Sequence, residues 1–221
     1  MTQKLTTIKT QIQRAEQEAG RKAGSTTLVA VSKVHNADTI RPVLDAGHKV
    51  FGENRVQEAQ RKWPALKADY PDVQLHLIGP LQTNKVKDAV ALFDVIETLD
   101  RPKLAHALAR QFTAQGLHRP CFIQVNIGAE PQKSGILPEQ LPAFLTLCRD
   151  ELALPIIGLM CIPPQGQDPR PYFALLQKLA TENDLGQLSM GMSADFPVAI
   201  AEGATHIRVG TALFGQRPAK T

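Results

Sequence analysis

A lysine that ends an apolar run has the clearest chemical potential in this chain. Residues 27–33 read Thr-Leu-Val-Ala-Val-Ser-Lys, which is typical of a strand buried on both faces in a parallel sheet. Burial disfavours the charged ammonium and lowers the pKa of a lysine, so that the neutral amine, which attacks aldehydes, is easier to reach. Lys33 is therefore a candidate for covalent binding of an aldehyde cofactor. The alternative is a lysine whose head simply extends from the strand end into water.

Two later segments have the composition of phosphate-binding loops. Gly191 and Ser193 precede one predicted helix, and Gly210 and Thr211 begin another. Glycines permit close backbone approach and hydroxyls can donate hydrogen bonds, while helix N-termini add amide donors and the positive end of the helix dipole. Ser193 and Thr211 could instead be ordinary N-caps.

A phosphate cradle together with Lys33 and Arg208 suggests pyridoxal phosphate as the aldehyde cofactor. Lys33 would form the Schiff base, the two loops would hold the phosphate, and Arg208 could reach the pyridine nitrogen. Considered alone, Arg208 could equally form a structural ion pair with Glu53 or another carboxylate.

The elements that must position these residues alternate between short apolar runs and helix-like segments. An amphipathic helix is predicted over 4–22, with its apolar stripe at Leu5, Ile8, Ile12, Ala15 and Ala19. Strands are predicted at 27–32, 48–52, 73–78, 94–98, 121–126, 155–160, 187–190 and 206–209. Helices are predicted at 37–46, 54–68, 83–92, 101–115, 138–149, 169–184 and 194–203.

Eight strands that alternate with helices predict an α/β fold of the (β/α)8 type, a TIM barrel, with an open doubly wound sheet as the alternative. No linker divides the chain, so we expect a single domain over residues 1–221, with the N-terminal helix in 1–24 and the barrel in 25–221. In such barrels the active site lies at the carboxyl ends of the strands, where the candidate residues stand.

Composition and charge narrow the class of protein. The 25 basic and 21 acidic residues are interspersed, so the net charge of +4 favours small anionic ligands over nucleic acid. No apolar run approaches the ~20 residues of a membrane span, and the N-terminus does not resemble a secretory signal. Three widely spaced cysteines support neither a disulfide framework nor a metal site. We expect a cytoplasmic protein without membrane association, and a monomer.

Motifs from the first predicted strand to the last resemble the pyridoxal phosphate homeostasis protein family, whose members look like the barrel half of fold-type III enzymes such as alanine racemase. The matching motifs are Val29-Ala-Val-Ser-Lys33, Phe51-Gly-Glu-Asn54, His76-Leu-Ile-Gly-Pro-Leu-Gln-Thr-Asn-Lys85, Gln124-Val-Asn126, Lys133-Ser-Gly135, Gly158-Leu-Met160, Leu188-Ser-Met-Gly-Met-Ser193 and Arg208-Val-Gly-Thr-Ala-Leu-Phe-Gly215. Two positions depart from the pattern: Val34 follows the lysine, and Cys161 stands where alanine is expected.

The resemblance implies a role for each candidate residue. Lys33 would carry the cofactor as an internal aldimine, and Asn54 and Met160 would surround the ring or the Schiff base. Phosphate contacts would come from Ser193, Gly210 and Thr211, with Arg208 near the pyridine nitrogen. His76 lies in a family motif, yet a buried, hydrogen-bonded histidine is the simpler interpretation.

Whether such a protein is an enzyme depends on its acid and base groups. Racemisation needs a base on each face of the substrate, and in the racemases that this chain resembles the second base is a tyrosine from a separate domain. The chain stops at Thr221, and its two tyrosines, Tyr70 and Tyr172, fall outside the predicted strand ends. An arginine cannot protonate the pyridine nitrogen, which weakens carbanion stabilisation.

We therefore expect a non-catalytic carrier that binds pyridoxal phosphate on Lys33 and buffers or delivers it to pyridoxal-phosphate-dependent apoenzymes. The resemblance implies the same role in vitamin B6 homeostasis. The alternatives are a weak amino-acid racemase and a barrel that binds another phosphate compound without covalent attachment.

Overall fold

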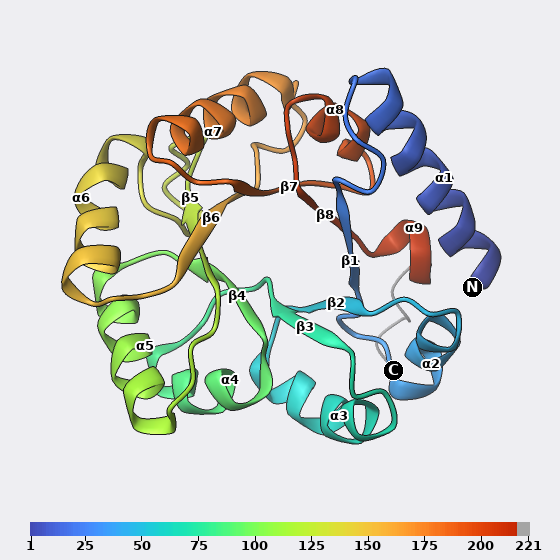
Figure 1. Ribbon diagram of the computed structural model, residues 1–221, viewed down its shortest axis with the longest axis horizontal. Coiled ribbons are helices and arrows are strands. Elements are labelled where there is room, and N and C mark those ends of the chain that lie inside the picture. Colours follow the sequence, from blue (N-terminus) through green and yellow to red (C-terminus); the bar gives the residue numbers. More distant parts are fainter. Residues whose placement is uncertain (216–221) are drawn as a thin grey trace.

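Parallel strands form a closed barrel in the computed structural model, which describes residues 1–215 (Figure 1). The strands are β1 Thr27–Val31, β2 Val50–Glu53, β3 Gln74–Leu77, β4 Val95–Leu99, β5 Cys121–Val125, β6 Ile156–Cys161, β7 Gln187–Met192 and β8 His206–Val209. Each strand pairs with the next in the sequence, and β8 pairs with β1 through registers such as Thr27 with His206. The predicted TIM barrel is confirmed, and the open-sheet alternative is wrong because β1 and β8 close the ring.

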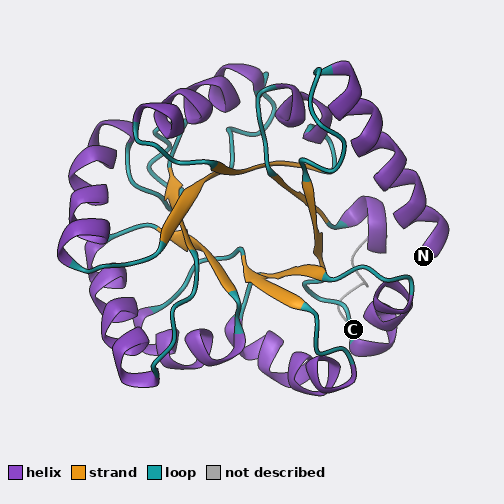
Figure 2. Cartoon of the chain, viewed as in Figure 1, coloured by secondary structure: helices purple, strands orange, loops and turns teal. Residues whose placement is uncertain are grey.

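Helices form the outer layer around this ring (Figure 2). They are α1 Thr2–Glu18, α2 Ala37–Asp45, α3 Val56–Asp69, α4 Val86–Leu92, α5 Pro102–Gln115, α6 Leu141–Thr146, α7 Arg170–Glu182, α8 Phe196–Ala201 and α9 Thr211–Phe214. A 3-10 turn at Thr83–Lys85 leads into α4, and α6 lies between a 3-10 turn at Pro138–Gln140 and a π-helical turn at Leu147–Glu151. The first helix, α1, packs against α8 and α9, so segments from both ends of the described chain lie side by side (Figure 1).

Many boundaries differ from the predicted ones by a few residues, and the differences at α1 and α8 have a clear local cause. The first helix ends at Glu18 rather than at residue 22, because Gly20 adopts the left-handed conformation (φ +64°) that terminates helices. Ala19 is therefore outside the helix and half-buried, whereas the rest of the predicted stripe is buried. The predicted helix at 194–203 is shorter, since a turn at 192–195 precedes Phe196 and Gly203 (φ +96°) follows its end. Within the predicted barrel region 25–221, residues 216–221 lie outside the described residues.

The main hydrophobic core lies between the strands and the helices. Leu28 and Ala30 of β1 belong to the same buried cluster as Ile40 of α2. Val29 and Val31 are buried too, but on the opposite face of the strand, because successive side chains alternate. The inward face of β1 therefore leads through Val31 to Lys33 at the carboxyl end of the strand.

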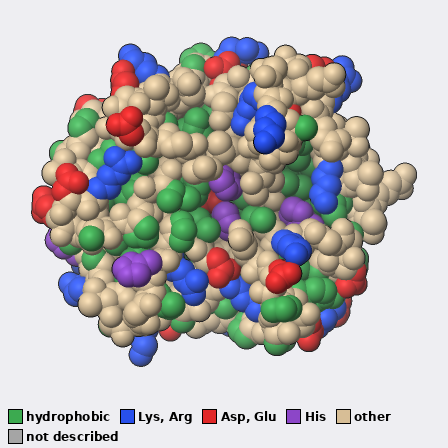
Figure 3. Space-filling model, in the orientation of Figure 1, with side chains coloured by type: hydrophobic (Ala, Val, Ile, Leu, Met, Phe, Trp, Pro, Cys, Tyr) green, Lys and Arg blue, Asp and Glu red, His purple; other side chains and the backbone are tan. Residues whose placement is uncertain are grey.

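Charges of both signs are distributed around the rim of the face shown in Figure 3, as the interspersed charges in the sequence predict. No helix in the described part of the chain has the length and apolar character needed to cross a membrane. The cysteines Cys121, Cys148 and Cys161 are buried free thiols.

Candidate functional site

A cavity of about 320 Å³ opens where strands β1, β2 and β8 end, within the range of about 300–1,000 Å³ typical of small-molecule sites. Its lining includes six of the predicted site residues, which are Lys33, Asn54, Ser193, Arg208, Gly210 and Thr211. They come from both ends of the sequence, and the pairing of β1 with β8 brings them together. The remaining lining is mostly apolar: Val31, Val34, His35, Ile78, Ile162, Met192, Ala194 and Gly215.

Met160 is the predicted site residue that does not line this cavity. It is fully buried on β6, paired in register with Gln124 and Ser189. The strand continues to Cys161, so Met160 lies deeper in the barrel than the strand end, and Ile162 lines the cavity instead.

The loop that carries Lys33 begins directly after β1. Lys33 itself is half-buried at the cavity wall. The next residue, Val34, has a left-handed backbone (φ +64°), which is unusual for a β-branched residue. The loop ends at Asn36, whose side-chain oxygen accepts a hydrogen bond of 3.0 Å from the Thr39 amide and caps α2.

Asn54 is positioned by a close backbone contact between the ends of β2 and β3. A Cβ atom on Gly79 would lie 2.3 Å from the Asn54 carbonyl oxygen, so only glycine fits there. This explains the glycine in the loop after β3, and it fixes the height of the Asn54 side chain at the cavity wall.

Neither hydroxyl of the predicted phosphate loops belongs to an N-cap. The N-cap of α8 is Asp195, two residues after Ser193, and the N-cap of α9 is Gly210, which precedes Thr211. The N-cap interpretation of Ser193 and Thr211 is therefore wrong, and both residues line the cavity instead. The preceding strand reaches its turn through Gly191 (φ +90°), whose Cβ would lie only 2.4 Å from the Ala199 Cβ.

Arg208 extends from β8 into a buried polar network. Its guanidinium donates to Ser189 Oγ (2.7 Å) and to the Cys161 carbonyl (2.8 Å). Ser189 Oγ donates in turn to Glu97 Oε2 (2.6 Å), and His76 Nδ1 lies 2.7 Å from Glu97 Oε1. His76 is thus the buried, hydrogen-bonded histidine expected from the sequence.

Glu97, the carboxylate of this network, is fully buried. Burial raises the pKa of its carboxyl, but the hydrogen bond and charge of His76 and the charges of Arg208 and His206 lower that pKa to about 2. The proposed pairing of Arg208 with Glu53 is wrong, since Glu53 forms its ion pair with Lys62 of α3 (2.9 Å).

Several residues around the site were missed at the sequence level. His35 lines the cavity and stacks on Phe214 of α9, with ring centroids 5.1 Å apart. Glu58 and Lys62 contact the Lys33 loop from α3. Their spacing of four residues is the usual signal of a helical ion pair, but it does not reveal that the pair faces a loop rather than water.

The fold and the site define a barrel of the alanine racemase class. Residues 4–218 match the family model for the alanine racemase N-terminal domain. The alanine racemase of Clostridium difficile is similar in fold, with a TM-score of 0.72 over 96% of this chain and 56% of that one, at 11% identity.

The close relatives identify the family within this class. The pyridoxal phosphate homeostasis protein of Aquifex aeolicus is 40% identical over 224 residues, covering 97% of each chain. The structure of PipY from Synechococcus elongatus with pyridoxal phosphate bound is 40% identical, covers 93% of this chain and 100% of that one, and has a TM-score of 0.80. The chain belongs to the pyridoxal phosphate homeostasis protein family.

Proposed function

We propose that this protein binds pyridoxal phosphate through a Schiff base on Lys33 and buffers or delivers the cofactor in vitamin B6 homeostasis. The observation that carries the proposal is that Lys33 lines the same cavity as Ser193, Gly210 and Thr211. PipY, a relative at 40% identity, binds pyridoxal phosphate, which supports the same ligand here.

The donor set suits each part of this cofactor. The Lys33 amine is the group that reacts with an aldehyde. The Ser193 and Thr211 hydroxyls, with the amides that begin α9, suit a phosphate, and apolar side chains such as Ile78 and Ile162 suit an aromatic ring. Asn54 offers an amide at the same wall.

The surroundings favour holding the cofactor over using it in catalysis. When bound, pyridoxal phosphate supplies an electron sink, which is strongest with its ring nitrogen protonated. Arg208 lines the cavity and is the residue we assign to that nitrogen, and a guanidinium cannot act as an acid in proteins. Its network through Ser189 to Glu97 fixes the position of the guanidinium.

A weak amino-acid racemase is the second candidate, and it would need a second base. The two tyrosines of the chain are engaged elsewhere: the Tyr70 hydroxyl donates to Asp45 (2.5 Å), and the Tyr172 hydroxyl bonds to Gln167. Neither tyrosine lines the cavity. General acid–base groups contribute about 10²–10⁴-fold each, so one missing base would leave little turnover.

Borohydride reduction followed by peptide mass analysis tests the proposal. The protein loaded with pyridoxal phosphate should yield a pyridoxyl adduct on Lys33, and the visible absorbance of the loaded protein should disappear in Lys33→Ala. An adduct-free Lys33 would refute covalent binding and favour a barrel that binds another phosphate compound. Robust amino-acid racemisation that is lost in Lys33→Ala would refute the carrier function and support the racemase.

A further inference from the structure

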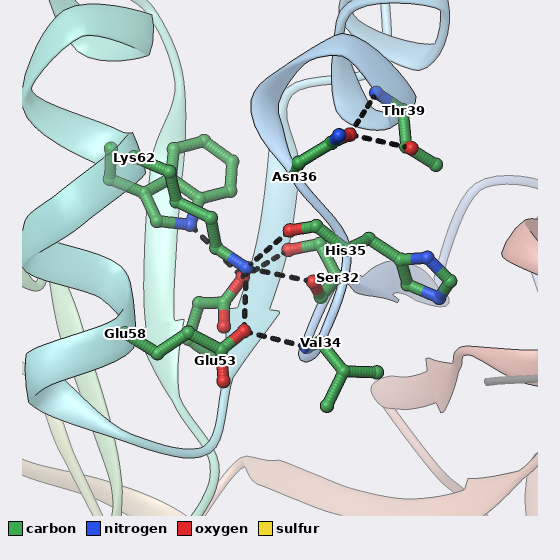
Figure 4. Close-up of polar contacts among 9 residues, drawn as sticks. Ser32, Val34, His35, Asn36, Thr39, Glu53, Glu58 and Lys62 are labelled. Carbon is green, nitrogen blue, oxygen red and sulfur yellow. Dashed lines mark hydrogen bonds and ion pairs between the residues drawn. The ribbon is translucent and has the colours of Figure 1, made fainter. Parts of the chain in front are cut away.

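A second lysine lies buried next to the Lys33 loop and takes no part in lining the cavity. Lys62 of α3 is 8% exposed, and its ammonium contacts two carboxylates, Glu53 Oε1 (2.9 Å) and Glu58 Oε1 (2.8 Å). The same ammonium donates to the carbonyl oxygens of Ser32 (2.9 Å) and His35 (2.9 Å). Figure 4 shows all of these groups converging on the Lys62 nitrogen from α3, β2 and the loop after β1.

The two carbonyls belong to the first and last residues of the turn that contains Lys33. Ser32 and His35 are the first and last residues of a turn whose centre is Lys33 and Val34, closed by a 3.2 Å hydrogen bond from the His35 amide to the Ser32 carbonyl. A single ammonium that binds both carbonyls therefore fixes the two ends of this turn from outside the barrel.

The middle of the turn is held by the same pair of side chains. The Val34 amide donates to Glu58 Oε1 (2.6 Å), the oxygen that also binds Lys62 (Figure 4). Val34 has a left-handed backbone, which costs a non-glycine residue on the order of 1–2 kcal/mol. Such a conformation persists only where the surroundings impose it. Here the contacts of Lys62 and Glu58 with the turn impose this conformation.

Stability alone does not account for this arrangement. Burial raises the pKa of Glu53, although the Lys62 charge and hydrogen bonds from Ser32, Lys62 and Trp63 oppose that effect. Exchanging a buried ion pair for well-packed apolar side chains is often neutral or stabilising. An ion pair that also contacts three backbone groups of one turn is suited to fixing the conformation of that turn.

We propose that Lys62 is a positioning residue, which with Glu58 fixes the turn that presents the Lys33 amine to an aldehyde ligand. This inference rests on the proposed function of Lys33. Bond formation between an amine and an aldehyde depends strongly on their relative placement, and small displacements can cost on the order of 10²-fold in rate. A loosened turn therefore slows covalent binding without removing any group that touches the ligand.

The test compares Lys62→Met with a matched variant on the same helix. Lys67 of α3 also donates to a backbone carbonyl, that of Leu92 (2.9 Å), and to a carboxylate, Asp94 (2.6 Å), but it holds a loop away from the cavity. If Lys62→Met alone folds poorly, the double variant Glu53→Gln/Lys62→Met takes its place, because it leaves no unpaired carboxylate at position 53.

Three quantities are measured on each variant: the rate of borohydride-trapped adduct formation on Lys33, the dissociation constant for pyridoxal phosphate, and the free energy of urea unfolding without ligand. We expect both Lys62 variants to form the adduct about 10–100-fold more slowly, and Lys67→Met to lose stability at an unchanged rate.

Wild-type rates and affinities in folded Lys62 variants would overturn the positioning role. Equal slowing in Lys67→Met would also overturn it, because the effect would then follow from general destabilisation. Absence of the Lys33 adduct in the wild-type protein would instead overturn the proposed function, so the two failures are distinct.

Discussion

Arg208 is oriented from inside the barrel rather than by the cavity that it lines. Its guanidinium donates to Ser189 Oγ and to the Cys161 carbonyl, and Ser189 donates in turn to Glu97. The side chain is only 4% exposed. A group fixed in this way loses little conformational freedom when a ligand arrives, which favours affinity.

The hydroxyl of Thr211 should act on the phosphate alone. We expect Thr211→Val to weaken binding of pyridoxal phosphate about tenfold, the equivalent of one hydrogen bond to a charged group. Binding of pyridoxal, which lacks the phosphate, should be unchanged. Titrations of visible absorbance with the two ligands measure this. Thr10→Val, on the exposed face of α1, is the control, and equal weakening of both ligands would contradict the assignment.

At the residue scale, the sequence reveals groups whose chemistry is explicit in their type. The amine and the hydroxyls could be found because they follow predicted strands, and the arginine because it lies near the end of one. The role of Lys62 could not, since on a helix it looks like any solvated lysine and its meaning depends on a loop 27–30 residues earlier in the chain. The sequence predicts that a strand ends at Met160, but β6 continues to Cys161. This extension is set by pairing with β5, which the hydrophobic pattern does not reveal.

At the element scale, the loops after β2 and β3 act as one unit. Gly79 lies directly against the backbone of Asn54, so the two loops cannot move apart or together without breaking this contact. This contact therefore restrains the wall of the cavity that Asn54 and Ile78 line.

Substitution at this contact should affect both the fold and the site. We expect Gly79→Ala to lower the free energy of unfolding by about 1–3 kcal/mol or more through overpacking, and to weaken pyridoxal phosphate binding through displacement of Asn54. Gly186→Ala is the matched control, because its Cβ meets nothing within 4 Å and its φ is not positive. Urea unfolding and ligand titration are measured on both variants. Unchanged stability and affinity in Gly79→Ala would contradict the role of this contact.

The order and type of the elements were predictable because apolar periodicity reports burial directly. The boundaries of the elements were less predictable. The end of α1 is decided by the backbone of Gly20, and the start of α8 by a side-chain contact from Asp195 to the Met192 amide (2.6 Å). Both are local conformations that hydrophobic patterning does not encode.

At the scale of the whole molecule, groups such as His48 and Glu97 make stability depend on pH. Burial lowers the pKa of His48 to about 4 from its ordinary 6.5, and the pKa of Glu97 is lowered to about 2 from 4.5. In each case the unfolded chain binds a proton at a higher pH than the folded chain. The contribution of His48 is therefore complete above pH 6.5 and is lost towards pH 4, and that of Glu97 is lost below pH 4.5.

We therefore expect the free energy of unfolding to fall as the pH is lowered from 7 to 4, by up to about 1.4 kcal/mol per pH unit for His48 alone. Urea unfolding at pH 7, 6, 5 and 4 measures the slope. His48→Gln should reduce it, whereas His106→Gln, at an exposed position on α5, should leave it unchanged. An identical slope in all three proteins would contradict the assignment to His48.

The pairing of β1 with β8 also determines when the cavity can form during synthesis of the chain. A chain synthesised from its N-terminus carries Lys33 long before the ribosome has produced Arg208 and Thr211, so the cavity does not exist until the ring closes. A ligand that contacts the ends of both strands would stabilise the closed ring by mass action. The complete cavity would therefore be available to a ligand only in a chain that has been synthesised through β8 and has closed the ring.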